Sequence, residues 1–568
     1  MAKAQATVEE LVGMIERGEL ELPEMQRGYV WPATRVRDLL DSLYRDYPSG
    51  TILLWETDEE VPTRDFAVAT DRSPYMTKRF LLDGQQRLTS LASVIRGKPV
   101  EVRGGQRTRE IEILFNLEHP DNLSEVLEVE EDNYDDADDD SDHDEVDASP
   151  DDLQRRIDQL TFVVGTSKLA RLPHWVKVSD VFKTDSDFEF LERAGVTEFR
   201  NPLAQKYSSR LQRLRAIRKY EYRMDILERS LDYNEVAEIF VRVNSKGTKL
   251  RSSDLALARI TAKWRNSLEL FEEFRAKCVT EHDFPLDLGI HLRSMIVHAT
   301  GQSRFKTVGS LPLERLQDAW NEHKRAFDYA LNFLRSNCGI SSPALLSSPL
   351  LIVALGFYGS KHDFNVDGDT ASALMRWARL ANAKGRYSRG SSETTLDQDL
   401  VVIRDGGTPS DLIERLRLQV GLLDVTVEEL DGKNQRSALF KTMFLAFSEL
   451  SAEDWRSSLK IDVTRSQGQH EIEVHHIFPQ ALVNKKYSKT LVNDIANLAF
   501  IDGRSNRRLS ARPPKEYVQE IMTSRGSQPF DRQIIPTEPT LLDLDNFEAF
   551  LAERRSRIAV ELNRFLQQ

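Results

Sequence analysis

The C-terminal part of the chain carries the side chains best suited to acid–base and metal chemistry. Adjacent histidines, His475 and His476, end an apolar stretch that Pro479 stops, and Asn497 and Asn506 follow. An imidazole with a free pKa of about 6.5 can take a proton from water near neutral pH. Imidazole nitrogens and amide oxygens can also hold a divalent cation. The alternative is a pair of ordinary histidines at a strand end that only hydrogen-bond or face solvent.

Short elements must position these residues. The sequence predicts a strand over 471–476, a second short strand over 493–501 closed by Asp502-Gly503, and a helix opened by Pro513-Pro514. Four arginines lie beside Asn506 and can grip phosphates of a nucleic acid. They are Arg504, Arg507, Arg508 and Arg512.

A second candidate site lies near the N-terminus, where Asp83-Gly84-Gln85-Gln86-Arg87 follows an apolar strand and opens a helix. Asp83 can cap that helix and Gly84 lets the backbone turn tightly. Unpaired N–H groups of the first turn favour an anion, and the fork of Arg87 matches phosphate geometry. The pattern indicates a seat for a polyphosphate or for DNA phosphates. Alternatively, Arg87 pairs with Asp83 and the glutamines solvate a surface turn.

Two further motifs are polar turns. Gln26-Arg27 stands among aromatic and proline residues, and Asn244 to Thr248 forms a donor-rich turn before a helix capped by Ser252 or Ser253. The chain contains no Gly-rich lysine loop of the Walker type.

Together these three motifs resemble, in order, the signatures of the N-terminal domain of GmrSD-type restriction endonucleases. That ParB-like (sulfiredoxin-like) fold also occurs in SspE-type phage-defence nucleases. The segment Gly385 to Asp397 is similar to the family as well. The resemblance implies nucleotide binding and NTP hydrolysis coupled to sensing of modified DNA. Its implied nucleotide-binding residues are Gln26, Arg27, Asp83, Gly84, Gln85, Gln86, Arg87 and Asn244, without a choice among GTP, UTP, CTP and ATP.

The C-terminal strand, strand, helix pattern resembles the ββα-metal fold of HNH nucleases, found at the C-terminus of GmrSD-like proteins. By that pattern His476 is the general base and Asn497 holds the loop that orients it, while His475 and Asn506 are metal ligands. Two protein ligands suit Mg²⁺ or Mn²⁺. Many relatives carry Asp or Glu in place of His475, and an imidazole shifts preference towards Mn²⁺, Ni²⁺ or Zn²⁺. Glu473, on the same strand face, is a further candidate ligand.

Composition sets limits on these interpretations. The net charge of −14 is local, because residues 118–152 hold 18 acidic residues and no Lys or Arg, and removing those 18 charges leaves +4. We expect this tract to be a disordered, solvated insertion; the alternative is a DNA-mimicking brake on a basic groove. Two cysteines exclude a disulfide scaffold and indicate a reducing, cytoplasmic location. The longest apolar run, 350–358, is too short to span a membrane.

We therefore predict an α+β multidomain protein. The first domain, 1–265, is ParB-like and includes strands over 51–55, 79–82 and 221–227. A helical linking domain covers 266–430, and the HNH nuclease domain covers 431–568.

The predicted function is an NTP-responsive, metal-dependent DNA endonuclease of type IV-like restriction and phage defence, cutting or nicking modified or foreign DNA. Self-association is compatible with the sequence. Two alternatives are an NTP-switched nucleic-acid-binding regulatory module without cleavage, and an RNA-directed nuclease, because fold alone does not decide the substrate.

Overall fold

The computed structural model describes residues 2–26, 28–64, 66, 79–102, 107–121, 157–198, 201–246, 251–461 and 472–568. The chain divides into two compact units, of which the first ends at Glu269 and the second begins at Leu270. The prediction of disorder for the acidic tract falls, from residue 122 onward, outside the described residues. No helix in the described ranges has both the length and the apolar character needed to cross a membrane.

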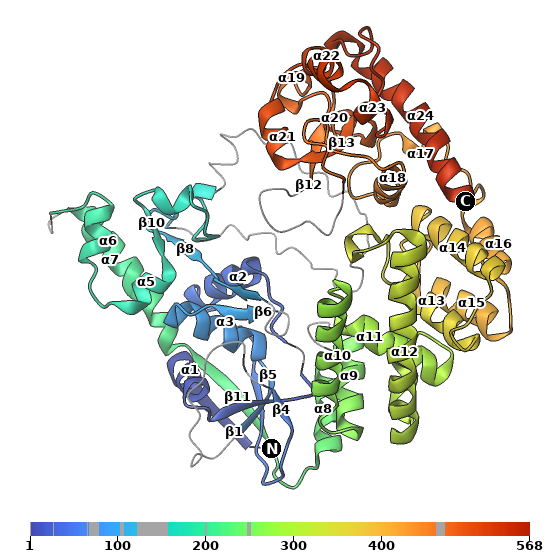
Figure 1. The fold of residues 1–568 in the computed structure, drawn as a ribbon. Coiled ribbons are helices and arrows are strands. Elements are labelled where there is room, and N and C mark those ends of the chain that lie inside the picture. Colours follow the sequence, from blue (N-terminus) through green and yellow to red (C-terminus); the bar gives the residue numbers. More distant parts are fainter. Residues whose placement is uncertain are drawn as a thin grey trace. The chain divides into compact units, whose positions relative to one another are not determined.

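A six-stranded mixed sheet forms the centre of the first unit (Figure 1). Its strand order is β1 (Ala2–Thr7), β11 (Glu221–Leu227), β3 (Ile52–Trp55), β5 (Arg79–Asp83), β2 (Leu20–Pro23) and β4 (Thr63–Arg64). The β11–β3 and β2–β5 pairs are parallel and the other pairs are antiparallel. The strands predicted over 51–55, 79–82 and 221–227 are thereby confirmed, as is the α+β class of this part of the chain.

Both faces of this sheet are covered at its centre, which explains why β2, β3 and β5 are largely apolar and buried. In β3, Ile52 and Leu54 belong to a core that includes residues of α1, α2 and α3, whereas Leu53 and Trp55 face a second core that includes residues of α8 and α9. These helices are α1 (Val8–Glu16), α2 (Ala33–Tyr44), α3 (Gln85–Arg96), α8 (Tyr233–Lys246) and α9 (Ser252–Lys263).

Smaller elements complete the first unit. A three-stranded antiparallel sheet has the order β10 (Trp175–Lys177), β8 (Ile113–Asn116), β9 (Phe162–Val164), and β9 contacts α2. The pair β6 (Val100–Val102) and β7 (Arg107–Arg109) stands apart from both sheets. The remaining helices are α5 (Val178–Lys183), α6 (Phe188–Arg193) and α7 (Pro202–Arg215), and α5 packs on α3.

The second unit begins with a helical region, as predicted (Figure 1). Its helices are α10 (Ser267–His282), α11 (Leu288–Thr300), α12 (Leu313–Cys338), α13 (Leu350–Lys361), α14 (Gly368–Ala383), α15 (Ser392–Arg404), α16 (Pro409–Val420), α17 (Val427–Leu430) and α18 (Ala438–Glu449). The apolar run 350–358 lies in α13, where it is buried against α11, α12 and α15.

A small α+β region follows, built on the antiparallel pair β12 (Ile472–His476) and β13 (Leu498–Asp502). Its helices are α19 (Gln480–Val483), α20 (Lys489–Val492), α21 (Gly503–Leu509), α22 (Pro514–Arg525), α23 (Gln528–Asp531) and α24 (Phe547–Gln567). The helix predicted after Pro513 is confirmed as α22. The prediction of a strand starting at 493 was wrong, because Asp494 caps a 3₁₀ turn over Ile495–Asn497 and the strand begins only at Leu498.

The motif from Gly385 to Asp397 joins helices of the second unit through buried charge. Arg386 donates to both carboxylate oxygens of Asp399, at 2.7 and 3.0 Å, and Tyr387 donates to the same carboxylate at 2.8 Å. Arg386 and Asp399 are nearly inaccessible to solvent. Breaking one partner of such a buried pair leaves an uncompensated charge, so this motif fixes α15 against the end of α14.

A buried carboxylate links β2 to α10. Glu24, 2% exposed, accepts a hydrogen bond from the backbone N–H of Asn266 at 3.0 Å, just before α10 begins. Burial raises the pKa of Glu24 to about 7, and the backbone N–H groups of Asn266 and Leu268 oppose that rise. Because α10 starts in the first unit and continues into the second, this contact stabilises the helix that connects them.

We predict that Glu24 makes the first unit less stable at alkaline pH. The pKa of Glu24 in the folded chain lies above its unfolded value of 4.5. The neutral carboxyl therefore contributes its full stabilisation below pH 4.5, and this contribution is lost as pH rises through about 7. The free energy of unfolding should fall by roughly 2–3 kcal/mol between pH 5 and pH 8 from this group. Urea unfolding should show a flatter pH profile for Glu24→Gln, whereas the exposed control Glu60→Gln should keep the wild-type profile. Identical profiles for Glu24→Gln and wild type would contradict the assignment.

Candidate functional site

Strand β12, strand β13 and helix α21 bring the C-terminal polar residues together. His475 pairs in register with Ala499, and His476 with Leu498. Alternation along β12 buries the imidazole of His475, 3% exposed, and leaves that of His476 half-buried. Asn506 lies in α21, a helix that the sequence reasoning missed. Its signal is Asp502, whose side chain accepts from the backbone N–H of Arg504 as the N-cap.

His475 belongs to a chain of polar contacts. Its Nδ1 lies 2.7 Å from Oδ1 of Asn506, whose Nδ2 donates to Glu473 at 2.6 Å. Because an amide oxygen only accepts, His475 donates from Nδ1, and its buried Nε2 has no partner among the described residues. Burial lowers the pKa of His475 to about 4, so the imidazole is neutral at pH 7. Gly503 allows this packing, since a Cβ there would collide with the Glu473 carboxylate.

A buried carboxylate anchors α21 to β13 beneath this cluster. Asp454, fully buried, accepts from the backbone N–H of Asp502 at 3.0 Å and from the hydroxyl of Ser505 at 2.8 Å. The next residue, Trp455, contacts the ring of His475 edge-on, with centroids 5.4 Å apart. The backbone before Asn506 is therefore held in place, and the amide itself is held by its hydrogen bonds with His475 and Glu473.

The residue types of this cluster suit a hard or borderline divalent ion, which His475 can bind through Nδ1 once that nitrogen gives up the proton it donates to Asn506. The Nδ1 atom of His475 and the Oδ1 atom of Asn506 face one another, and Glu473 adds a carboxylate to the same chain of contacts. No group of three or more His, Cys, Asp or Glu side chains in the described parts of the chain is arranged to hold a metal. Any ion at this cluster would therefore rest on one imidazole, one amide oxygen and one carboxylate, with its remaining positions open.

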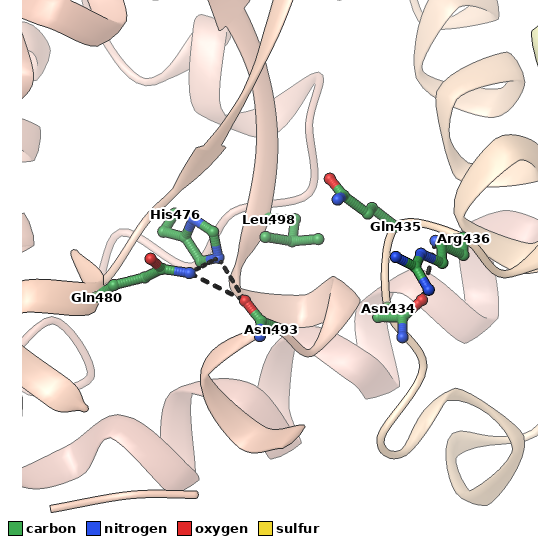
Figure 2. Close-up of a pocket in the computed structure, with 7 residues that line it drawn as sticks. All are labelled: Asn434, Gln435, Arg436, His476, Gln480, Asn493 and Leu498. Carbon is green, nitrogen blue, oxygen red and sulfur yellow. Dashed lines mark hydrogen bonds between the residues drawn. The ribbon is translucent and has the colours of Figure 1, made fainter. Parts of the chain in front are cut away.

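His476 faces a separate pocket with a volume of about 260 Å³. Figure 2 shows His476, Gln480 and Asn493 on one side, Asn434, Gln435 and Arg436 on the other, and Leu498 between them. Oδ1 of Asn493 accepts from Nε2 of Gln480 at 3.0 Å and lies 3.0 Å from Nε2 of His476. When the imidazole donates from Nε2 to this oxygen, the lone pair on its Nδ1 is left to accept a proton. Burial lowers the pKa of His476, and the hydrogen bond to Asn493 opposes that effect.

Asn497 does not contact His476 but holds the backbone that follows it. Its Oδ1 accepts from the N–H of Phe478 at 2.8 Å, and its Nδ2 donates to the carbonyls of Phe478 and Val492 at 3.2 and 2.9 Å. The backbone carbonyl of Asn497 also accepts from the N–H of Ile477 at 2.8 Å. Asn497 thus holds the loop after His476, while Asn493 and Gln480 contact the imidazole itself.

The four predicted DNA-binding arginines differ in their surroundings. Arg507 lies 3.6 Å from Glu473, and Arg512 pairs with Glu520 at 2.9 Å. Arg504 and Arg508 are exposed on α21, and Arg508 forms no ion pair with any residue that the structure describes. Of these four arginines, Arg508 is therefore the one best able to contact a DNA phosphate without breaking an existing ion pair.

In the first unit, several of the predicted nucleotide-binding residues hold together the segments at the ends of the central strands β3 and β5. Arg87 donates to the carbonyls of Ser49 and Thr51 and, at 3.0 Å, to Asp83, so the alternative pairing of Arg87 with Asp83 is present. Gln86 accepts from the backbone N–H groups of Val30 and Trp31, at 2.9 and 3.2 Å.

The other predicted nucleotide-binding residues are buried glutamines, a glycine that allows a turn, and residues whose side chains the structure does not describe. Gln26 is buried and donates to the carbonyl of Leu81, and Gln85 is buried at the start of α3. Gly84 has a positive φ of 102°, and a Cβ there would collide with Ile52. Asn244 lies in the last turn of α8 instead of in a turn, and its side chain and Arg27 lie outside the described residues.

Sequence reasoning missed the residues that complete the His476 pocket. Asn493 was read as part of a strand, although Asn-Asp before a short apolar run is also the signature of a turn with its own side-chain hydrogen bonds. The run Asn434 to Arg436 is a polar loop at the expected domain boundary, between α17 and α18. Nothing in the local pattern of that loop indicates a contact with a histidine some 40 positions later.

Replacing Asn497 with alanine should destabilise the second unit. The substitution leaves the buried N–H of Phe478 and two carbonyls without partners, and we expect the free energy of unfolding to fall by roughly 2–4 kcal/mol. Denaturant unfolding of the full chain measures this loss, with the exposed Asn484→Ala as control, expected within about 0.5 kcal/mol of wild type. Wild-type stability of Asn497→Ala would show that the three hydrogen bonds do not hold this loop.

Two comparisons with known proteins bear on these sites. Residues 8–261 match the sequence model of the GmrSD restriction endonuclease N-terminal domain. The chain is also 24% identical over 554 residues to the uncharacterized protein MJ0686 of Methanocaldococcus jannaschii, covering 90% of this chain and 86% of that protein. The matched range contains Gln26, Asn244 and the segment Asp83 to Arg87, and it ends before α10. The resemblance is thus confirmed for the N-terminal domain, and it relates the first unit of this chain to restriction endonucleases.

Proposed function

We propose that this chain is a metal-dependent DNA endonuclease of a restriction or phage-defence system, with an HNH site in its second unit. The observation that carries the proposal is the placement of two adjacent histidines with different tasks. His475 meets Asn506 at 2.7 Å in a buried cluster, while His476 faces a polar pocket. The family match over residues 8–261 supports DNA as the partner.

Hydrolysis of a phosphodiester needs an activated water and stabilisation of the charge that develops on the phosphate. A divalent cation, when bound by His475 and Asn506, supplies the charge stabilisation. His476, neutral near pH 7 because burial lowers its pKa, accepts the proton of the attacking water. Asn493 and Gln480 both lie within hydrogen-bond distance of Nε2 of His476 and aim the ring, and Asn497 holds the backbone beyond it.

We further propose that the first unit is ParB-like, binds a nucleotide and couples it to sensing of modified DNA. The family match supports this role, whereas the fork of Arg87 is already engaged by Ser49, Thr51 and Asp83. Cleavage of matched modified and unmodified plasmids, with and without each NTP, tests the coupling. Equal cleavage under all of these conditions would contradict the proposed coupling between nucleotide binding and sensing of modified DNA.

Two alternative functions, a regulatory module without cleavage and an RNA-directed nuclease, can be distinguished from the proposed one by their substrates and products. A regulatory module without cleavage would bind DNA but leave plasmid intact with every metal, and an RNA-directed nuclease would cut RNA in preference to DNA. Side-by-side RNA and DNA substrates with Mg²⁺ and Mn²⁺ separate these cases from the proposed activity.

We predict that His476→Ala lowers plasmid cleavage by roughly 100- to 10,000-fold, because the general base is lost. Folding and DNA affinity should be retained, and that affinity should fall steeply with salt as phosphate contacts release counterions. The control is His362→Ala, a partly exposed histidine on the helical part of the same unit, which should cut as wild type. Wild-type cleavage by His476→Ala would refute the assigned role.

Metal binding gives a readout independent of cleavage. Calorimetric titration with Mn²⁺ should show at least about tenfold weaker binding for His475→Ala and Asn506→Ala, since each removes a ligand. Asn506→Asp keeps an oxygen ligand and should bind Mn²⁺ at least as well as wild type, while His476→Ala should bind it unchanged. Unaltered Mn²⁺ affinity in both alanine variants would mean that the cluster holds no metal.

A further inference from the structure

The pocket of His476 has a second wall that the proposed chemistry does not use. Asn434, Gln435 and Arg436 come from the loop between α17 and α18 and face His476 across the pocket (Figure 2). Gln435 and Arg436 are exposed. Arg436 forms no ion pair with any residue that the structure describes. An unpaired guanidinium beside a polar cavity is suited to an anionic ligand.

The backbone of this loop is held by hydrogen bonds, so the points from which its side chains extend are set before any ligand binds. Oδ1 of Asn434 accepts from the backbone N–H of Arg436 at 2.9 Å, and its carbonyl accepts from the hydroxyl of Ser437 at 2.8 Å. Ser437 in turn caps α18 by accepting from the N–H of Phe440. The turn that presents Arg436 is thus continuous with a helix.

The same loop is tied to the turn that carries Asn493. Asp494, fully buried, accepts from the backbone N–H of Gly432 at 2.8 Å, and the N–H of Ile495 donates to the carbonyl of Lys433 at 2.7 Å. Arg555 neutralises that carboxylate at 2.7 Å and also pairs with Asp431. Both walls of the pocket therefore rest on one carboxylate, which keeps Arg436 at a fixed place opposite His476.

We propose that Asn434, Gln435 and Arg436 form the substrate-binding wall of the nuclease pocket, with Arg436 binding a backbone phosphate of the strand that is cleaved beside His476. The inference rests on the proposed nuclease function and specifies the ligand of this wall: the phosphate backbone of a nucleic acid. Gln435 and Asn434 offer neutral donors and acceptors beside it. Arg436 thus acts in substrate binding from the side of the pocket opposite the histidine.

The test measures DNA affinity separately from cleavage, in full-length protein that carries His476→Ala. Fluorescence anisotropy with a labelled duplex should show roughly five- to tenfold weaker binding for Arg436→Ala, and a slope of log affinity against log salt smaller by about 0.9. Arg436→Lys should restore the slope. Gln435→Ala should weaken binding without changing the slope, since no charge is removed, and Arg417→Ala, an exposed arginine on α16, should change neither quantity.

Kinetics in the otherwise wild-type chain supply the second readout. Arg436→Ala should raise KM with kcat little changed, as expected for a binding contact made equally in the ground and transition states. Unchanged affinity and salt slope in Arg436→Ala would overturn the inference. A chain that binds DNA through Arg436 but does not cut it in the presence of any metal tested would overturn the nuclease function alone. The two failures are therefore distinguishable.

Discussion

The buried carboxylate of Asp494 is the constraint on which the candidate active site depends. Its two oxygens accept from the backbone N–H groups of Gly432 and Ala496 and from the guanidinium of Arg555. A carboxylate removed from water needs this full set of partners, because an unpaired buried charge is strongly destabilising. Meeting that requirement brings together a loop before α18, the turn after α20 and the final helix. The pocket of His476 lies where the first two meet.

Helix α24 acts as the support for this arrangement. Arg554, fully buried, donates to the carbonyls of Ala496 and Leu498 at 2.8 and 2.7 Å, beside the pair formed by Arg555. Near the end of the helix, Asn563 exchanges hydrogen bonds with the backbone of Val425, ahead of α17. The last helix therefore holds segments on both sides of β12, and the C-terminal α+β region extends structurally to residues before 431.

Much of the fold was predictable from local pattern. Strand β11 matched its predicted bounds, because buried Tyr222 and Met224 alternate with exposed Glu221 and Arg223 in the period of a strand. His475, His476 and Asn506 were found because the chemistry limits residue types. Helix α21 was missed because seven residues are too few for an apolar period to show. Asn493 and Arg436 were missed for another reason: Asn493 meets His476 across 17 positions and Arg436 lines the same pocket from a distant loop, and no local signal encodes either placement.

In the first unit, the side chains of the segment Asp83 to Arg87 stabilise the fold, and the same segment is a candidate nucleotide-binding site. Gln86 and Arg87 use their side chains to fix the segments around Trp31 and Ser49. Their substitution would disturb the fold of this edge as well as any ligand. Helix α3 begins at Gly84, which supplies no side-chain cap, so the N–H groups of its first turn keep their capacity for an anion. If the proposed nucleotide binds here, its phosphates are held by backbone N–H groups, and the glutamines and the arginine keep that backbone in place.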